Sequence, residues 1–230
     1  MKKNILIIGG SSGIGFEIVK QIHEVHNVYV ANRTNDSLSD FKHQFIKVDI
    51  TEETIDSTLL PDSLDGLVYC PGTINLRPFR GLKPETFISD FNLNVMGAVK
   101  NIQAVLKNLN QSEHSSIVLF STVAVQTGMP FHSSIAASKG AIEGLTRSLA
   151  AELAPKISVN AIAPSIVNTP LADKFLNNDT KMERAVERHP LKKVGSPKEL
   201  AETAIFLLEK SSWITGQVIR VDGGIGNLKI

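Results

Sequence analysis

A glycine-rich segment near the N-terminus has the residue types and the spacing that bind a phosphate chain. The run Gly9–Gly15 directly follows the apolar segment Asn4–Ile8, and a helical period opens behind it at Phe16, Ile18 and Val19. Glycines permit a tight turn and a close approach of the backbone, and a helix N-terminus presents free N–H groups and the positive end of its dipole. A turn that binds nothing is the alternative, but the flanking strand and helix are the context that a dinucleotide site requires. We predict that the pyrophosphate contacts Gly9, Ser11, Ser12, Gly13, Ile14 and Gly15.

The end of the second predicted strand carries the residues that would distinguish between two nicotinamide cofactors. Asn32 stands where a site for NAD(H) usually presents an acidic residue to the ribose hydroxyls, and Arg33 follows it. A neutral amide does not repel a 2′-phosphate, and a guanidinium grips one in a fork. We predict that the cofactor is NADP(H) rather than NAD(H). The alternative is that Arg33 stacks on the adenine or faces water.

Short apolar runs that alternate with longer segments of helical period must hold these residues in place. This alternation is typical of βαβ units around a parallel sheet, and bare apolar runs suit strands that are buried on both faces. The sequence therefore predicts an α/β fold of Rossmann type, with a doubly wound parallel sheet of about seven strands and helices on both faces. The predicted strands are Asn4–Ile8, Val28–Ala31, Gln44–Val48, Gly66–Cys70, Ser116–Ser121, Ile157–Ile162 and Gln217–Val221.

Two predicted helices have recognisable starts, and a third has a recognisable end. Pro84 and Glu85 suit a first helical turn, and Ser196–Glu199 places an N-cap serine, a proline and a capping-box glutamate in order. The longest helix is predicted over Ser133–Ala154 and ends before Pro155. The apolar face of the helix that begins at Pro84 is predicted to comprise Phe87, Phe91, Val95 and Val99.

The chain shows no internal repeat, low-complexity block or linker, which predicts a single dinucleotide-binding domain over residues 1–230. The segment Leu171–Val194 is the most polar and irregular part, and we predict that it forms a mobile flap over a substrate pocket. Hydrophobic residues make up 42% of the chain, while 24 basic and 23 acidic residues leave a formal charge of +1. This composition indicates a globular protein and no surface for nucleic acid.

The N-terminus indicates neither secretion nor a membrane anchor. The apolar run Ile5–Ile8 stops at Gly9, whereas a secretory signal needs about 7–15 apolar residues and a membrane span about 20. The one cysteine, Cys70, is ordinary for a reducing compartment. We therefore expect a cytoplasmic protein with no membrane partner, and we predict no metal site.

The spacing Gly-x-x-x-Gly-x-Gly, with two serines inside it, resembles the short-chain dehydrogenase/reductase family. The resemblance extends over nearly the whole chain. The further motifs that carry it are Val48–Ile50, Asn94–Gly97, Ala137–Ala141, Val159–Pro164, Thr215–Gln217 and Val221–Gly224.

The resemblance implies further cofactor contacts. Asp49 would lie beside the adenine with Ile50 packed near it, and Lys139 would contact the nicotinamide ribose hydroxyls. The other implied contacts are Cys70, Pro71, Gly72, Pro164, Val167 and Thr169. Two stretches depart from the family pattern, since Tyr69–Gly72 replaces Asn-Asn-Ala-Gly and Pro164-Ser165 replaces Pro-Gly. Cys70 is interpreted as a packed thiol rather than a nucleophile, because nothing near it in sequence would lower its pKa.

The resemblance also implies a catalytic arrangement, and one member of it is missing. In this family a Tyr acts as general acid/base, a Lys four residues later lowers the pKa of its phenol, and a Ser thirteen residues before the Tyr polarises the carbonyl. Lys139 matches the Lys, and Asn94 matches an Asn that supports a water chain. Ile135 stands at the position of the Tyr, and Thr122 replaces the Ser. The chain thus resembles a divergent member that lacks the catalytic Tyr.

A histidine is the candidate for the missing proton donor. His132 lies three positions before Ile135, and histidine titrates near neutral pH. A surface loop residue is the alternative interpretation. Ser134 is adjacent to the vacant position, but a serine alone is a poor acid. Of the two tyrosines, Tyr29 lies far from this motif, and Tyr69 ends the fourth predicted strand near the expected cofactor.

Two functions follow from these observations. The first is an NADP(H)-dependent oxidoreductase that transfers a hydride to or from a small carbonyl or alcohol substrate, with Thr122, Lys139, Asn94 and His132 as its catalytic residues. The second is a catalytically silent dinucleotide-binding protein that serves as a sensor or a structural subunit. By resemblance, the long helices would pack against partner copies in a homodimer or homotetramer.

The predicted substrate pocket is built from the segments 73–80, 125–132 and 171–194. Arg77, Arg80 and His132 within these segments indicate an anionic or polar substrate.

Overall fold

The computed structural model describes residues 2–229, and its strands form one parallel sheet. The strands are β1 (Asn4–Ile8), β2 (Asn27–Asn32), β3 (Gln44–Lys47), β4 (Gly66–Tyr69), β5 (Ser115–Phe120), β6 (Ile157–Pro164) and β7 (Val218–Val221). Their order across the 7-stranded sheet is β3-β2-β1-β4-β5-β6-β7, and every neighbouring pair is parallel. The predicted fold class is confirmed.

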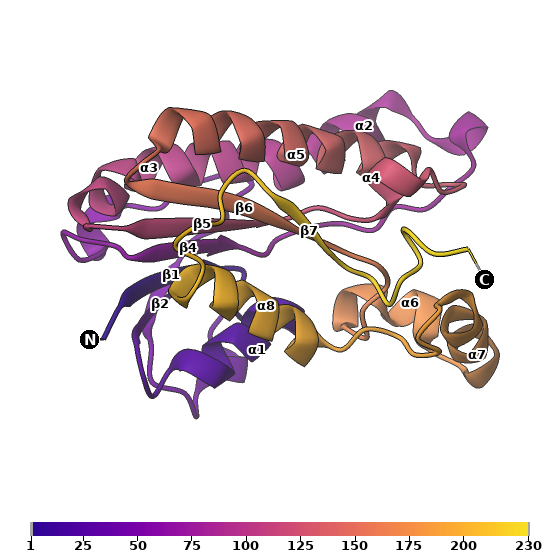
Figure 1. Cartoon of the computed structure of the whole chain (residues 1–230), viewed down its shortest axis with the longest axis horizontal. Coiled ribbons are helices and arrows are strands. Elements are labelled where there is room, and N and C mark those ends of the chain that lie inside the picture. Colours follow the sequence, from indigo (N-terminus) through magenta and orange to yellow (C-terminus); the bar gives the residue numbers. More distant parts are fainter. Residues whose placement is uncertain (1, 230) are drawn as a thin grey trace.

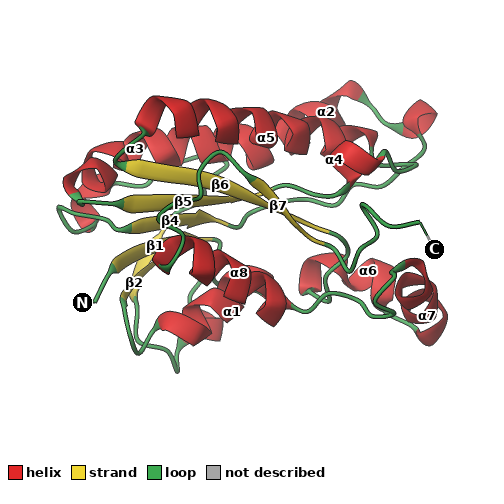
Figure 2. Cartoon of the chain, in the orientation of Figure 1, coloured by secondary structure: helices red, strands yellow, loops and turns green. Residues whose placement is uncertain are grey.

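Helices cover both faces of this sheet because its strands are apolar on both sides. In β1, Ile5 and Ile7 pack in the core beneath α1 (Gly13–Ile22) and α8 (Pro197–Glu209). Leu6 and Ile8 point the other way, into the core beneath α3 (Gly97–Gln111) and α5 (Ser133–Leu153). All four side chains are fully buried. Successive side chains of a strand point to opposite faces, so an unbroken apolar run builds both cores at once. Figures 1 and 2 show the two helical layers above and below the sheet.

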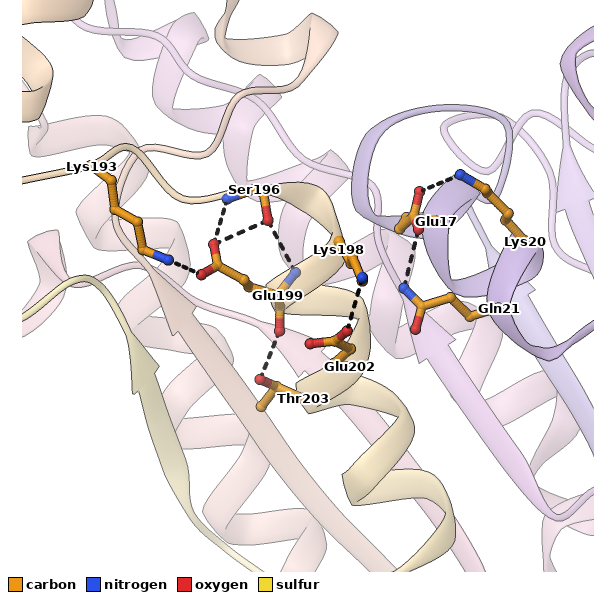
Figure 3. Close-up of polar contacts among 9 residues, drawn as sticks. All are labelled: Glu17, Lys20, Gln21, Lys193, Ser196, Lys198, Glu199, Glu202 and Thr203. Carbon is orange, nitrogen blue, oxygen red and sulfur yellow. Dashed lines mark hydrogen bonds and ion pairs between the residues drawn. The ribbon is translucent and has the colours of Figure 1, made fainter. Parts of the chain in front are cut away.

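The start of α8 has the predicted capping box (Figure 3). The Ser196 hydroxyl accepts from the Glu199 backbone N–H at 3.3 Å, and the Glu199 carboxylate accepts from the Ser196 N–H at 2.9 Å. Lys193 also contacts this carboxylate, and the contact with Lys193 is the main cause that lowers the pKa of Glu199 to about 2. These contacts satisfy N–H groups at the helix start that would otherwise lack partners.

The predicted helix at Pro84 is interrupted by a wide turn. α2 (Pro84–Phe91) continues through a π-helical turn at Asn92–Met96 into α3. Val95 is buried as expected, but Phe91, predicted on the same face, is 40% exposed. A π-helical turn holds one more residue than an α-helical turn, so the α-helical period does not carry across it. The prediction of a single apolar face from Phe87 to Val99 is therefore wrong.

The segment 171–194 is more regular than its sequence predicted. It contains α6 (Asp173–Leu176) and α7 (Asp179–Arg188). The remaining helix, α4 (Ala124–Thr127), is a short one elsewhere in the chain, just before α5. Asn178 caps α7 by accepting from the Lys181 N–H at 3.0 Å. Ala172, Leu176 and Ala185 form a small apolar cluster within the segment. α7 carries a short apolar stripe at Met182, Ala185 and Val186, at helical spacing, which the sequence analysis missed among the surrounding charged residues.

Helix length and composition also bear on membranes. Within residues 2–229, no helix is both long and apolar enough to cross a bilayer.

Candidate active site

Two adjoining cavities lie around the carboxyl ends of the central strands. The order of the sheet reverses between β1 and β4, and open α/β sheets bind ligands at such a reversal. The glycine-loop cavity, about 730 Å³, runs from the Gly9–Ile14 loop to the ends of β2 and β3. The apolar cavity, about 400 Å³, lies between the ends of β5 and β6, α5 and α7. Cys70, Gly72 and Thr169 line both cavities, so the two sites are continuous.

The glycine loop packs so closely against neighbouring backbone that side chains at its glycines would not fit. Gly9 and Gly13 have positive φ angles of 83° and 56°, a region that favours glycine. A Cβ atom on Gly15 would lie 2.2 Å from the carbonyl oxygen of Gly9. The loop therefore folds closely over the start of α1, where a helix N-terminus presents free N–H groups to a ligand.

The structure brings most of the predicted cofactor residues to the glycine-loop cavity. Gly15 lies behind its surface, while Pro164, Val167 and Lys139 line the apolar cavity instead. The predicted residues that line the glycine-loop cavity are Gly9, Ser11, Ser12, Gly13, Ile14, Asn32, Arg33, Asp49, Ile50, Cys70, Pro71, Gly72 and Thr169.

Asn32 and Arg33 have different environments at the end of β2. With its amide oriented to satisfy both ends, Asn32 accepts from the Ser11 N–H at 2.6 Å and donates to the Ala31 carbonyl at 3.0 Å. Asn32 thereby ties β2 to the glycine loop. Arg33 is exposed at the same edge, and its charge contributes to lowering the pKa of Asp49. The main causes of that lowered pKa are the hydrogen bonds from Thr51, whose hydroxyl donates at 2.7 Å.

Lys139 and Asn94 both lie beside Gly72, which lines both cavities. A Cβ on Gly72 would lie 3.3 Å from Asn94 Oδ1 and 3.6 Å from Lys139 Nζ. Asn94 donates to the Asp90 carbonyl at 2.8 Å and to the Thr73 hydroxyl at 3.1 Å, but its Oδ1 has no partner although it is buried. Burial lowers the pKa of the Lys139 ammonium to about 8. These groups can hold a hydroxyl or a water between them.

Asp90 is a buried acid that the sequence analysis missed. Its carboxylate is fully buried and accepts from the hydroxyls of Thr73 at 2.6 Å and Ser134 at 2.5 Å and from the Asn75 amide at 2.7 Å. Its charge raises the pKa of Lys139, against the larger effect of burial. A buried carboxylate with three donors holds its neighbours in fixed positions. The signal in the sequence was an acid four residues before Asn94, one helical turn away.

Three of the predicted catalytic residues line the apolar cavity. Thr122, at the end of β5, His132, at the start of α5, and Lys139 surround it together with Ile135, which fills the position between them. His132 is half-buried, and its Nδ1 lies 2.7 Å from the Pro130 carbonyl. Asn94 does not line this cavity and reaches it through Thr73.

Neither Tyr69 nor Cys70 replaces the missing phenol. The Tyr69 hydroxyl donates to the Leu93 carbonyl at 2.6 Å, within the helical layer, and burial raises its pKa. Cys70 is half-buried and lines both cavities. Burial raises the pKa of its thiol to about 12, and Lys139 only partly opposes this. A thiol with so high a pKa is protonated and a weak nucleophile.

The charged residues of the apolar cavity differ from those that the sequence indicated. Arg77 and Arg80 are absent from its lining, whereas His132, the third residue of that interpretation, lines it. Those two arginines lie on an exposed loop that points its charges to solvent. The walls are mostly aliphatic and aromatic, and besides Lys139 the basic side chains at the cavity include Lys181, Arg184 and Arg188 of α7.

Comparisons with known proteins agree with this geometry. Residues 9–226 match the family described as enoyl-(acyl carrier protein) reductase. The chain is 30% identical to L-xylulose reductase from Bos taurus, over 96% of each chain. Among solved structures, a short chain dehydrogenase family protein from Francisella tularensis superposes with a TM-score of 0.87 at 28% identity, over 99% of this chain and 100% of the other. The structure of ElxO with NADP bound gives a TM-score of 0.86 at 27% identity, over 98% of this chain and 99% of ElxO.

Proposed function

The chain belongs to the short-chain dehydrogenase/reductase family, and from this premise we propose that it is an NADP(H)-dependent oxidoreductase acting on an apolar carbonyl or alcohol substrate. The observation that carries the proposal is the pair of adjoining cavities. One has a glycine cradle and Arg33, and the other places Thr122 and Lys139 in apolar walls. A protein that only sensed a dinucleotide would need the first cavity and not the second.

The residues present fit a dinucleotide. The positive φ angles of Gly9 and Gly13 and the close contact beneath Gly15 leave a backbone cradle that a Cβ would fill. Arg33 would hold a 2′-phosphate in a fork, and Asp49 would border the adenine. The unpartnered Oδ1 of Asn94 and the Lys139 ammonium would hold the nicotinamide ribose or a water beside it.

The chain's own residues would orient the substrate and stabilise charge on its oxygen. The bound cofactor would supply or accept a hydride at the substrate carbon. Thr122 would donate a hydrogen bond to the carbonyl oxygen, and the buried Lys139 ammonium would stabilise the negative charge that develops there. Ile135 donates no proton, so in this divergent member the proton comes from another group. The apolar walls exclude water, which strengthens both interactions.

The substrate that best fits the cavity is an apolar carbonyl compound with an anionic group at one end. On α7, Arg184 and Arg188 are four residues apart and both line the cavity, whereas Glu183 and Glu187 do not line it. Lys181 is already engaged, because its ammonium donates to the Lys174 carbonyl and to Asn177 Oδ1 at 2.8 Å. Within residues 2–229, no ion pair engages Arg184 or Arg188.

Three further assignments belong to the same proposal. The protein would be cytoplasmic, would form a homodimer or homotetramer through its long helices, and would use the segment 171–194 as a flap over the substrate. Light scattering of the purified protein checks the assembly, and a monomer at micromolar concentration would contradict it.

Calorimetric titration with NADPH, NADH and their oxidised forms tests the cofactor. We expect NADPH to bind most tightly. Oxidation of NADPH is then followed with pairs of aryl ketones that differ only in a terminal carboxylate. We expect faster turnover of the carboxylate member, and a loss of that preference in an Arg184→Ala, Arg188→Ala double variant. The absence of turnover with every ketone, despite tight NADPH binding, would contradict the oxidoreductase proposal.

A further inference from the structure

A serine and a histidine form a hydrogen-bonded pair in the wall of the apolar cavity. Ser165 follows β6, and His189 follows α7. The two side chains lie 2.8 Å apart, from Ser165 Oγ to His189 Nε2, and both residues line the cavity. His189 is only 3% exposed, whereas Ser165 is half-buried at the cavity surface. The pair therefore joins a buried imidazole to the space where a substrate would lie.

The backbone fixes the direction of the hydrogen bonds. His189 Nδ1 lies 2.6 Å from the Ala185 carbonyl oxygen, which only accepts hydrogen bonds. Nδ1 therefore carries a proton, and in the neutral imidazole Nε2 is the acceptor of the Ser165 hydroxyl proton. When the ring is protonated, Nε2–H donates to Ser165 Oγ instead, and the hydroxyl proton is free to point into the cavity. Gly223 packs on the ring, since a Cβ there would lie 3.3 Å from His189 Cδ2.

Ser165 lies next to the residue that would bind the substrate oxygen. Phe120 of β5 and Ile162 of β6 are register partners, and beyond them the Val123 N–H donates to the Pro164 carbonyl at 3.1 Å. Thr122 and Ser165 therefore leave the sheet on neighbouring strands and line the same cavity. A hydroxyl at this position stands where the family resemblance implies a glycine.

We propose that Ser165 and His189 form a proton relay that replaces the absent phenol, an inference that rests on the proposed function. In the reductive direction, the carbonyl carbon gains the hydride and its oxygen gains the electron pair of the broken π bond. That oxygen takes the proton of Ser165 Oγ, and Ser165 Oγ takes the proton of the His189 Nε2–H. The imidazole becomes neutral, keeps its Nδ1–H on Ala185, and regains a proton from water. In the oxidative direction each transfer is reversed.

The relay resolves the weakness of serine as an acid. A serine hydroxyl becomes useful in proton transfer when a histidine holds it and exchanges protons with it. The charged groups at the same cavity are Lys181, Arg184 and Arg188 of α7 and Lys139 of α5. His132 lines the cavity too, and its Nδ1 lies 2.7 Å from the Pro130 carbonyl oxygen.

The relay is tested by measuring NADPH oxidation with phenanthrenequinone and with an aryl ketone. Ser165→Ala removes only the hydroxyl, and Ser165→Thr keeps one. We expect Ser165→Ala and His189→Ala to lower kcat by about 100-fold, the size of a general acid/base contribution, with KM changed less than about threefold. Ser165→Thr is expected to retain most of the activity. His114→Ala, at the amino end of β5, is the matched histidine control and is expected to keep wild-type turnover.

A second substitution separates proton supply from a structural effect. Ile135→Tyr places a phenol in the same cavity, and it is expected to restore turnover in the Ser165→Ala background, which a distorted site would not allow. Unchanged kcat in Ser165→Ala, or a large loss in His132→Ala alone, would overturn the relay while leaving the oxidoreductase proposal intact. A wild-type protein that binds NADPH but reduces neither compound would overturn the proposed function, and the relay with it. Melting temperatures identify any variant that fails to fold. If His189→Ala fails to fold, Ser165→Ala alone still tests the relay.

Discussion

The two adjoining cavities are built in different ways. The glycine-loop cavity owes its shape to backbone geometry within a few consecutive residues, such as the positive φ angles of Gly9 and Gly13. The apolar cavity owes its polar groups to side chains that meet across long stretches of chain, as in the pairs Ser165–His189 and Asp90–Ser134. A backbone cradle tolerates almost no substitution, whereas a side-chain site changes its chemistry one residue at a time. The comparison explains how the apolar cavity can carry Ile135 in its wall while the glycine-loop cavity keeps its glycine pattern.

Breaking the first cavity should have the largest effect. Gly15→Ala would place a Cβ 2.2 Å from the Gly9 carbonyl oxygen, so the loop must shift. We expect NADPH affinity to fall by at least about 100-fold, close to 3 kcal/mol, in calorimetric titration. Gly144→Ala is the control, because a Cβ there meets nothing within 4 Å. Ala should stabilise α5 by about 0.5–1 kcal/mol and leave binding unchanged. Equal affinities in the two variants would contradict the cradle.

Restoring the phenol should have the next largest effect. Ile135 is 5% exposed at the wall of the apolar cavity, and Ile135→Tyr would place a hydroxyl near Thr122 and Lys139. Ile135→Phe supplies the same ring without the hydroxyl. In the Ser165→Ala background, where the relay is absent, we expect kcat of the Tyr variant to exceed that of the Phe variant by about 100-fold, because general acid catalysis is worth about that much. Equal kcat values would mean that this cavity no longer positions a carbonyl beside residue 135.

The cofactor preference depends on one exposed guanidinium. Arg33→Ala should weaken NADPH binding by roughly 10- to 100-fold and change NADH binding less than about twofold, since only NADPH carries the 2′-phosphate. Arg33→Lys keeps the positive charge but not the paired hydrogen bonds of a guanidinium, so its NADPH affinity should lie between those of the wild type and Arg33→Ala. Parallel titrations measure both ratios. An equal loss for the two cofactors would assign Arg33 to the adenine ring instead.

The smallest effect is a pH dependence at the junction of the cavities. Burial lowers the pKa of Lys139 to about 8, so raising the pH through 8 converts its ammonium to a neutral amine. A neutral amine binds hydroxyl groups less strongly than an ammonium, and we expect NADPH affinity to fall, by less than about tenfold, between pH 7 and 9. The Lys139→Met variant should bind more weakly and lose this dependence. A wild-type affinity that rises with pH would contradict the assignment.

The sequence predicted the sheet well because its strands carry their signal locally. All seven predicted strands are present, and β1 begins and ends where the apolar run Asn4–Ile8 does. The glycine loop was predictable for the same reason, since strand, loop and helix follow one another directly. The capping box at Ser196 needed only four residues. Each of these features is complete within a short stretch of chain, which is what a single sequence can show.

The missed features depend on tertiary contacts. Ser165 and His189 are separated by 24 residues, and Asp90 and Ser134 by 44, so no spacing rule joins them. The departure from Pro-Gly at Ser165 was visible, but its partner was not. The helix α7 was missed because its apolar side is small, and its cap, Asn178, lies within a polar segment that resembles a loop. The π-helical turn leaves the local apolar pattern unbroken, so Phe91 was placed on the wrong face.

Because of the π-helical turn at Asn92–Met96, the side chains of α2 and those of α3 need not share one helical face. Each residue of an α-helix advances the direction of the side chains by about 100°, so one extra residue offsets α3 from α2 by about that angle. α2 directs Asp90 toward Ser134, while α3 directs Ile102 and Val105 into the core on the sheet. Deletion of one residue from this turn would put α2 and α3 in one α-helical period. Asp90 could then no longer contact Ser134 while Ile102 and Val105 stay in the core. The π-helical turn thus sets the direction of Asp90 on α2 separately from the packing of α3 on the sheet.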